Sequence, residues 1–339
     1  MDVTAIVPAH NKGANIEATI KALKQQVRKV IVACDHCTDD TYQKSIQAGA
    51  VAFETVDNQH RKAGALNQAL ENYVDWQLPD QYIFICDADT VIADDWIERA
   101  QIAIDAGGYD AVGSVFFGDA DRSSMIEFCQ QLEWYRYTNQ IKRSKKVFVL
   151  TGTASMVSAE MFQKVKARKG SFYDEDSITE DFALTIDLKE AGARIISPIS
   201  CYCTTEIMPN WRLLFLQRRR WYLGALQQMV RRKWDRVLFP YVFQQLMLLI
   251  SVLAFMGLIV FTGYLMVQDL IIFSFFWFFN WSDFCSRAGD YDLEPRSAGK
   301  DICINDFSRI IYSLFLQIAY LGALVQLLSG SAGTWNHLD

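Results

Sequence analysis

The chain up to residue 207 alternates between two patterns of hydrophobic and polar positions. One is a short apolar run rich in β-branched residues, and it predicts strands at Thr4–His10, Lys29–Asp35, Ala50–Val56, Tyr82–Asp89 and Asp110–Gly118. The other places apolar residues at helical spacing, and it predicts helices within Ala14–Gln26, Asp39–Gly49, Ala63–Trp76 and Asp94–Gly107. This alternation predicts an α/β fold whose Rossmann-like, mostly parallel sheet is covered by helices on both faces.

Further along, the pattern becomes continuously apolar. Val242–Val267 is uncharged and longer than the roughly 20 residues needed to cross a bilayer, so we expect a transmembrane helix there. Residues 310–328 form a second run of sufficient length, whereas 270–281 has only about a dozen apolar residues and suits a short or re-entrant segment. The alternative for each run is a buried core helix, which would normally keep one polar stripe.

The charges next to the first apolar run indicate its orientation. Arg231, Arg232, Lys233 and Arg236 precede it, and basic residues favour the cytoplasmic side. The first ten residues show no basic and apolar pattern of a cleavable signal, so we expect the α/β domain to stay in the cytoplasm. The expected protein is a multi-pass protein of the cell (inner) membrane.

Length and charge fit this organisation. The 339 residues suit one large globular unit with an appendage. We expect an α/β domain at 1–207, an interfacial amphipathic helix at 208–236 and a membrane region at 237–339. The net charge of -6 argues against a nucleic-acid partner, because such proteins usually carry a basic surface.

Ligands of such sheets bind beyond the carboxyl ends of the strands, so the strand-to-helix junctions are the places to look for chemistry. The junction after the first strand, PAHNKGAN, lacks the glycine pattern of dinucleotide-binding proteins, and the chain has no P-loop. The fourth strand ends in CDADT. Strand alternation would place Asp87 and Asp89 on one side, where two carboxylates suit Mg²⁺ or Mn²⁺ shared with phosphates, unless they are merely an acidic turn.

Two other junctions carry candidate ligands. Asp35 ends the second strand, where its carboxylate can accept hydrogen bonds from a nucleobase; helix capping explains the acids that follow but not Asp35. Arg61 and Lys62 stand just before a helix start, where they can meet phosphate or simply form a solvated basic pair.

The segment Ser177–Ala193 is predicted to be a helix with Thr179 as its cap. Glu180 and Asp181 then lie in the first turn, where the helix dipole favours their ionised forms. A carboxylate at that place can take a proton from an attacking hydroxyl, although a depressed pKa makes it a modest base. Helix capping alone is the alternative explanation.

A helix starting at Pro209 would combine four residues on one face: Gln217, Arg220, Trp221 and Gly224. Arg218 and Arg219 would point elsewhere, toward lipid headgroups. Four leucines are expected on or in lipid: Leu213, Leu214, Leu216 and Leu223. A purely electrostatic anchor is the alternative, but it would not need a glutamine and a glycine in register with Arg220.

These segments, in this order, resemble the family-2 glycosyltransferases with a GT-A fold, in particular the membrane-integrated branch with chitin, hyaluronan and cellulose synthases and NodC-like enzymes. The matching segments are IVPAHN, DHCTDDT, KAGALN, DAD, GTASMVSAEMF, TED and QRRRW. Together they extend from about Thr4 to Trp221. The GT-A fold is therefore the expected fold of the catalytic domain.

The resemblance implies a role for each matching residue. The UDP-sugar donor would be held by Pro8, Ala9, Asp35, Lys62, Asp87 and Asp89. Asp89 would also ligate Mg²⁺ or Mn²⁺, and Asp181 would be the general base. The acceptor and the diphosphate would be contacted by Glu180, Gln217, Arg220 and Trp221.

The expected function is therefore inverting, metal-dependent transfer of a sugar from a UDP-sugar to a saccharide or lipid-linked acceptor at the membrane, with polysaccharide synthesis as one outcome. Lys12 departs from the family, which very often has Glu there, so the contacts near the ribose are expected to differ. The apolar segments are fewer than large polymer synthases use. The alternatives are a polyprenyl-phosphate glycosyltransferase and a catalytically silent nucleotide-binding membrane scaffold.

Overall fold

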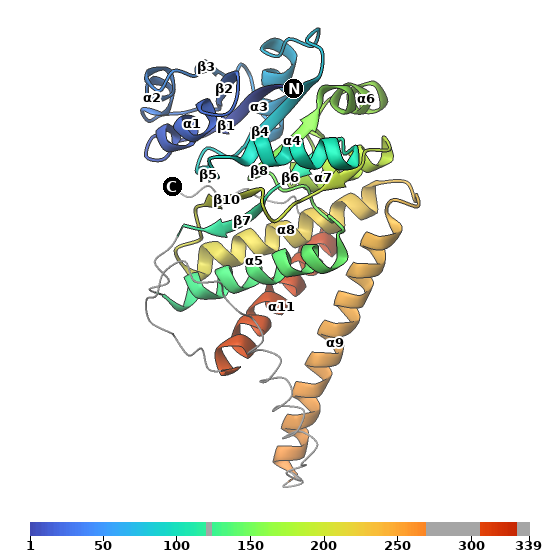
Figure 1. The fold of residues 1–339 in the computed structure, drawn as a ribbon. Helices are drawn as coiled ribbons and strands as arrows, with labels where there is room; N and C mark the ends of the chain where they lie inside the picture. Colours follow the sequence, from blue (N-terminus) through green and yellow to red (C-terminus); the bar gives the residue numbers. More distant parts are fainter. Residues whose placement is uncertain (120–123, 269–305, 331–339) are drawn as a thin grey trace.

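The computed structural model describes residues 1–119, 124–268 and 306–330, and a seven-stranded sheet forms its centre (Figure 1). In spatial order the strands are β3 (Val51–Glu54), β2 (Lys29–Cys34), β1 (Asp2–Ala9), β4 (Gln81–Cys86), β8 (Ala154–Ser158), β6 (Ala111–Gly113) and β9 (Ile195–Ile196). Only β8 runs antiparallel to its neighbours. The predicted mostly parallel sheet is confirmed.

Helices cover both faces of this sheet, as the sequence predicted. They are α1 (Ile16–Lys24), α2 (Thr41–Gln47), α3 (Arg61–Asn72), α4 (Trp96–Gly107), α6 (Ala159–Lys169) and α7 (Glu180–Glu190). The helix α5 (Met125–Ser144) packs instead against Val115–Gly118, outside this sheet. Alternate strand residues enter two separate cores. Val30 and Val32 pack with α1 and α4, whereas Ile31 packs with α3 and α6.

One predicted strand is in fact two. The segment Asp110–Gly118 breaks at Ser114 into β6 and β7 (Val115–Gly118), and β7 joins a second sheet with β10 (Tyr202–Thr205) and β5 (Thr90–Ile92). Ser114 is buried at the break, where its N–H donates to Ala154 and its hydroxyl accepts from the Trp96 indole. Both bonds involve residues far away in sequence, so local pattern could not reveal the change of sheet.

The end of β4 also differs from expectation. The strand stops at Cys86, and Asp87 to Asp89 form a turn that the Thr90 N–H closes on the Asp87 carbonyl at 3.2 Å. Strand alternation therefore does not put the two aspartates on one side. The turn directs each of them to a different lysine, as described below.

The basic stretch forms α8 (Trp211–Arg231), with Asn210 as a side-chain cap. It packs against α11 (Asp306–Leu328), and α5 lies close by (Figure 1). Three expectations of lipid contact are wrong, because Arg218, Leu214 and Leu223 are at most 1% exposed inside the protein. The structure uses this helix as a packed element rather than a simple anchor.

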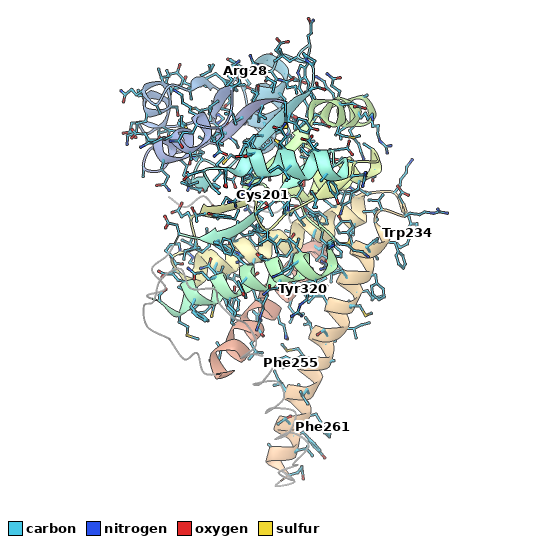
Figure 2. All side chains as sticks on the ribbon, in the orientation of Figure 1. Arg28, Cys201, Trp234, Phe255, Phe261 and Tyr320 are labelled. Carbon is cyan, nitrogen blue, oxygen red and sulfur yellow. The ribbon has the colours of Figure 1, made fainter. Side chains whose placement is uncertain are left out.

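Among the described residues, two helices are long and apolar enough to cross a membrane: Phe239–Leu265 within α9 (Phe239–Val267), and Ile311–Leu328 within α11. Only 6% of the most apolar part of α9 is buried, which excludes a core helix there. α9 extends away from the sheets, and Phe255 and Phe261 project from it (Figures 1 and 2). An apolar surface of this size requires a membrane or a partner. Residues 270–281 lie outside the described residues.

Candidate active site

The predicted donor residues stand at the carboxyl ends of three neighbouring strands. Pro8 and Ala9 end β1, Asp35 follows β2, and Asp87 and Asp89 follow β4. Because β1 lies between β2 and β4, the fold brings these junctions to one edge of the sheet. The Ala9 carbonyl accepts the Asp35 N–H at 2.8 Å, which fixes the first two junctions to each other.

Asp35 is held rigidly at this edge. One carboxylate oxygen, Oδ1, accepts from Thr55 at 2.7 Å and from Asn58 at 2.8 Å, and it lies 2.9 Å from the His36 ring. Asn58 also donates to the Arg61 carbonyl at 2.7 Å and so ties Asp35 to the start of α3. A fixed carboxylate suits recognition of a hydrogen-bond donor such as a base N–H.

Lys62 joins two of the acidic segments. It lies in the first turn of α3, and its Nζ is 2.6 Å from Asp87 and 2.8 Å from Glu180. Burial alone would lower the pKa of Lys62, but the two carboxylates more than offset it, so the pKa lies well above its usual value. The ammonium is therefore charged, and it neutralises part of a strongly acidic site.

A glycine lies directly beside this lysine. A Cβ on Gly152, just before β8, would lie 2.8 Å from Lys62 Nζ and 3.5 Å from the Glu180 carboxylate. The Gly152 N–H donates to Asp181 at 3.3 Å. This residue lies within the matching GTASMVSAEMF segment, but only the tertiary contact shows that it borders Lys62 and Asp181.

The two acids at the start of α7 are shifted in opposite directions. Burial raises the pKa of Glu180, yet the Lys62 ammonium outweighs it and lowers that pKa overall. Burial, followed by the charge of Glu180, raises the pKa of Asp181. The expected depression of the Asp181 pKa by the helix dipole is thus wrong. Neighbouring carboxyl groups whose pKa values are shifted in opposite directions are typical of acid–base sites.

Asp87 belongs to the same coupled group. Burial raises its pKa to about 6, against the opposing charge of Lys62. Burial also lowers the pKa of Arg220 on α8, while Glu180, Asp181 and Asp87 act in the opposite direction. The structure therefore brings Lys62, Asp87, Glu180, Asp181 and Arg220 into one electrostatic cluster.

The other predicted residues of α8 contact Arg218 instead. The Trp221 ring centroid lies 4.2 Å from the Arg218 guanidinium. The same guanidinium donates a hydrogen bond to the Gln217 side chain. Trp221 is 36% exposed. Gly224 is pressed against Thr179, where an added Cβ would collide with the threonine side chain, so α8 is set directly over α7.

Asp89 is held separately by a cation. Lys12 Nζ is 2.9 Å from Asp89 and 2.7 Å from Glu206, and the Thr205 hydroxyl donates to Asp89 at 3.3 Å. Lys12 is the position that departs from the family pattern. Its partner Glu206 follows β10, a strand that the local sequence pattern did not predict.

The carboxylates at this edge can share a divalent cation with a ligand, but they do not enclose one by themselves. In the part of the chain that the structure describes, no three His, Cys, Asp or Glu side chains are placed to form a cage. Mg²⁺ or Mn²⁺ needs no such cage when phosphate oxygens complete its shell. The Asp89 side chain is 18% exposed and the Lys12 side chain 25%, so Lys12 can yield and the residues fit a metal shared with a donor diphosphate.

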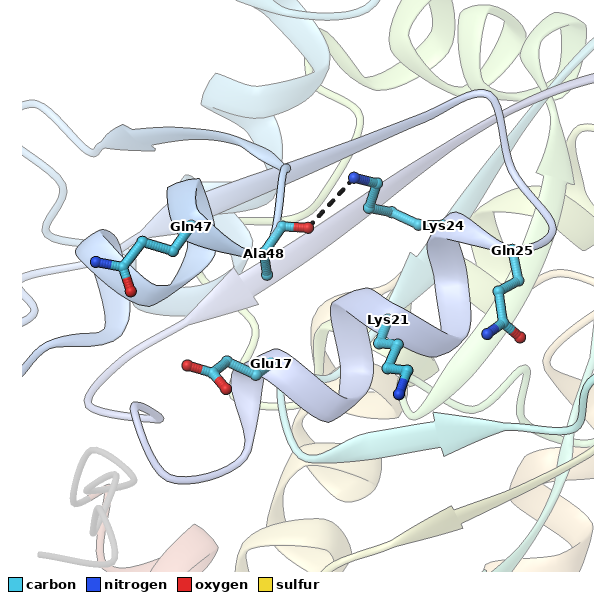
Figure 3. Close-up of a pocket in the computed structure, with 6 residues that line it drawn as sticks. All are labelled: Glu17, Lys21, Lys24, Gln25, Gln47 and Ala48. Carbon is cyan, nitrogen blue, oxygen red and sulfur yellow. Dashed lines mark hydrogen bonds between the residues drawn. The ribbon is translucent and has the colours of Figure 1, made fainter.

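A separate hollow lies away from this cluster. It has a volume of about 550 Å³ between α1 and α2, and Lys24 donates to the Ala48 carbonyl across it at 3.3 Å (Figure 3). The lining residues are mostly exposed and polar. None of them belongs to the acidic cluster, so the hollow has no part in the chemistry described here.

The arrangement of the sheet and its helices is the GT-A fold. Residues 4–166 match the model of the family described as Glycosyl transferase family 2, and the chain therefore contains a domain of that family. The predicted family and the predicted enzyme class are confirmed.

Curated relatives give the same class. The poly-beta-1,6-N-acetyl-D-glucosamine synthase of Staphylococcus aureus (strain COL) is 26% identical over 238 residues, which is 68% of this chain and 56% of the relative. The synthase of the same name from Staphylococcus epidermidis is 24% identical over 243 residues, 69% of this chain and 57% of the relative. The chain thus spans little more than half the length of these relatives.

A solved structure shares the fold. The mannosyltransferase PcManGT from Pyrobaculum calidifontis, in complex with GDP-Man and Mn²⁺, superposes with a TM-score of 0.65 at 17% identity. The match covers 97% of this chain and 87% of that one, so it extends beyond the sheet domain into the apolar helices. Together with the exposed α9, the synthase relatives indicate a glycosyltransferase associated with a membrane.

Proposed function

We propose that this protein transfers a sugar from a UDP-sugar to a saccharide acceptor at a membrane surface, with a divalent metal and with inversion at the anomeric carbon. The observation that carries the proposal is the cluster around Lys62, in which Asp87 and Glu180 share one ammonium while the neighbouring Asp181 has a raised pKa. Such an arrangement separates a charge-binding function from a proton-accepting one.

On the donor side, Asp35 would accept hydrogen bonds from the uracil, next to Pro8 and Ala9. Lys62 and Arg220 would face the diphosphate, since both are cations within the acidic cluster. When bound, Mg²⁺ or Mn²⁺ would supply positive charge for the leaving UDP, with Asp89 as its protein ligand. PcManGT, solved with GDP-Man and Mn²⁺, supports a metal-bound nucleotide sugar on this fold.

On the acceptor side, Asp181 would take the proton of the attacking hydroxyl. As the new bond to the anomeric carbon forms on one face, the bond to the UDP oxygen breaks on the other, which inverts the configuration. A base works best when its pKa approaches the working pH, and burial together with Glu180 moves the pKa of Asp181 in that direction. Gln217 and Trp221 would contact the acceptor sugar.

The nature of the sugar is proposed from the relatives. Their names specify a polymer of N-acetyl-D-glucosamine, so UDP-N-acetylglucosamine is the first donor to test and a short oligosaccharide of the same sugar the first acceptor. We further propose that residues 1–207 are the cytoplasmic catalytic domain, 208–236 an interfacial helix, and 237–339 the membrane region.

The test uses the full chain purified in detergent with a panel of UDP-sugars and GDP-mannose, with Mn²⁺, Mg²⁺ or EDTA. Nucleotide release and product mass are read together. We expect UDP release from UDP-N-acetylglucosamine that EDTA abolishes, and an acceptor lengthened by one or more sugars. Consumption of GDP-mannose alone would overturn the UDP-sugar assignment, and a product consisting of one sugar on a polyprenyl phosphate would replace the saccharide acceptor by a lipid.

A further inference from the structure

Arg218 is a buried charge in the middle of α8. It is 1% exposed, and its guanidinium meets the Glu133 carboxylate of α5 in a fork: Nη2 lies 3.0 Å from Oε2, and Nε lies 3.2 Å from each oxygen. A buried arginine is tolerated only with such a partner, because desolvation of the lone charge would cost several kcal/mol. The pair fixes the plane of the guanidinium.

The same carboxylate is shared with the apolar helix α11. The Tyr312 hydroxyl donates to Glu133 Oε2, the oxygen that also accepts from Arg218. Tyr312 is 5% exposed and lies in an apolar cluster with Ile126, Cys129 and Leu214. Glu133 therefore connects α5, α8 and α11 at one point.

Arg218 in turn supports the aromatic residue that we assign to the acceptor. The Trp221 ring lies over the guanidinium at 4.2 Å, and Arg218 also donates to Gln217. Cation–π contacts of this kind contribute about 0.5–2 kcal/mol, and they depend on the position of the cation over the ring. With 36% of Trp221 exposed, part of the indole is available to a ligand while the guanidinium holds the ring.

Stability does not explain this arrangement well. Buried ion pairs can often be replaced by apolar residues without loss of stability, and the surroundings of Tyr312 are already apolar. What the polar contacts provide is a defined geometry, which links Tyr312 of α11 through Glu133 and Arg218 to the indole.

We propose that Glu133 and Tyr312 are positioning residues, which hold Trp221 for the acceptor sugar through Arg218, so that α11 takes part in acceptor binding. This inference rests on the proposed role of Trp221 in the transfer reaction. It assigns a function in the reaction to a contact between the catalytic part and the second apolar helix.

The first experiment measures the position of the indole without any substrate. Full-length protein in detergent is exposed to hydroxyl radicals, and oxidation of Trp221 is quantified by peptide mass spectrometry in the wild type, Tyr312→Phe and Glu133→Gln. Tyr320→Phe is the matched control, because Tyr320 is an equally buried tyrosine of α11 whose hydroxyl contacts the Gln245 carbonyl of α9 instead. We expect oxidation to rise about threefold in Tyr312→Phe, in line with the loss of a weak positioning contact, and to stay unchanged in the control. Equal oxidation in both tyrosine variants would overturn the proposal.

The second experiment measures acceptor use with the N-acetylglucosamine oligosaccharide and UDP-N-acetylglucosamine. Tyr312→Phe should raise the acceptor KM about fivefold while the donor KM and UDP release without acceptor stay unchanged. In a Trp221→Ala background the same substitution should have no further effect, because a positioning residue acts only through the residue it positions. Additive effects of the two substitutions would contradict the proposal.

These outcomes separate the two levels of inference. A wild type that uses no UDP-sugar refutes the proposed function, whereas footprinting still reports whether Tyr312 controls the indole. A wild type that elongates the oligosaccharide, with Tyr312→Phe indistinguishable from Tyr320→Phe in both experiments, refutes the positioning role alone.

Discussion

The ammonium of Lys62 lies 2.6 Å from the carboxylate of Asp87, so the first turn of α3 is joined directly to the turn that follows β4. The same ammonium reaches Glu180 at 2.8 Å. Three segments far apart in sequence thus meet at one ammonium group, whose positive charge offsets part of the negative charge of Asp87 and Glu180.

Lys62→Met should destabilise the protein and weaken donor binding. The substitution leaves the buried carboxylates of Asp87 and Glu180 without their cation, which typically costs about 3 kcal/mol. Thermal unfolding in detergent and UDP binding by calorimetry measure the two effects. Lys164→Met is the control, since Lys164 forms an exposed pair with Glu160, and pairs of that kind contribute about 0–1 kcal/mol. Equal loss of stability in both variants would show that the central pairing is not important.

Asp181→Asn should lower kcat by about 10³-fold with little change in donor binding, because it removes the proton acceptor and keeps the side-chain shape. Asp176→Asn, at an exposed aspartate in the preceding loop, is the control. Product formation in single-turnover assays checks this. A variant that turns over at the wild-type rate would remove Asp181 from the mechanism.

The pH dependence should follow the same residue. Burial and Glu180 raise the pKa of Asp181 above 3.8, so kcat/KM should fall as the pH drops through that raised pKa. Stability should change in the opposite direction: the contribution of a raised carboxyl pKa is present below the unfolded value of 3.8 and is lost as pH rises through the folded pKa. Comparing pH profiles of activity and melting with those of Asp181→Asn isolates both effects. If the residual activity of Asp181→Asn still falls in the same way at low pH, another group is responsible for that fall.

Lys12→Ala should tighten the binding of Mn²⁺ in the presence of UDP, by about tenfold, because a cation and the metal compete for the Asp89 carboxylate. Electron paramagnetic resonance of free Mn²⁺ measures the affinity without turnover. Asp89→Asn should abolish the same binding. Unchanged affinity in Lys12→Ala would mean that the metal is held elsewhere.

Gly224→Ala should separate α8 from α7 and lower stability by about 2 kcal/mol, because the new methyl group would overlap the Thr179 side chain. Activity should fall with it, since Glu180 and Asp181 start α7 immediately after Thr179. Gly257→Ala on α9 is the matched control, as a Cβ there meets nothing within 4 Å. Adding Thr179→Ala should restore part of the loss. A stable, fully active Gly224→Ala would show that the two helices are free to separate.

Lys189 predicts a change of stability at alkaline pH. Burial lowers its pKa to about 8, while its ammonium donates to the Val147 carbonyl and contacts the Tyr241 hydroxyl at the start of α9. Between about pH 8 and the usual lysine value of 10.5, the unfolded chain holds a proton that the folded chain has released, so stability should rise with pH over this window. Lys189→Met should lack that rise in melting experiments between pH 8 and 10.5.

Much of the fold followed from local pattern. Apolar runs between amphipathic segments identified β1, β2, β3 and β4 with the helices α1 to α4, because burial on both faces of a parallel sheet leaves a signature within each segment. The short strands β5, β9 and β10 were not predicted. With two to four residues each, they have no period of their own, and they form through partners distant in sequence.

The site shows the same division. Asp35, Asp87, Asp89 and Asp181 were predicted as site residues from their positions at junctions and from resemblance to a family, but the expected strand alternation that would pair Asp87 with Asp89 was wrong. Lys12, Gly152 and Glu206 were not assigned to the site. Lys12 and Gly152 lie at positions that the resemblance marked, but their partners could not be read from those positions, and no local pattern marks Glu206.

By itself, the amino-acid sequence determined the α/β class, the apolar helix α9 and the set of acidic junctions, because each of these depends on the order of residues within one segment. The tertiary structure decided which charges share a partner and which are buried. Arg218 illustrates this difference: its place on an amphipathic helix suggested contact with lipid, yet packing of α5 and α11 against α8 encloses it beside Glu133. Burial and charge pairing are properties of neighbours in space, and those neighbours exist only once the chain has folded.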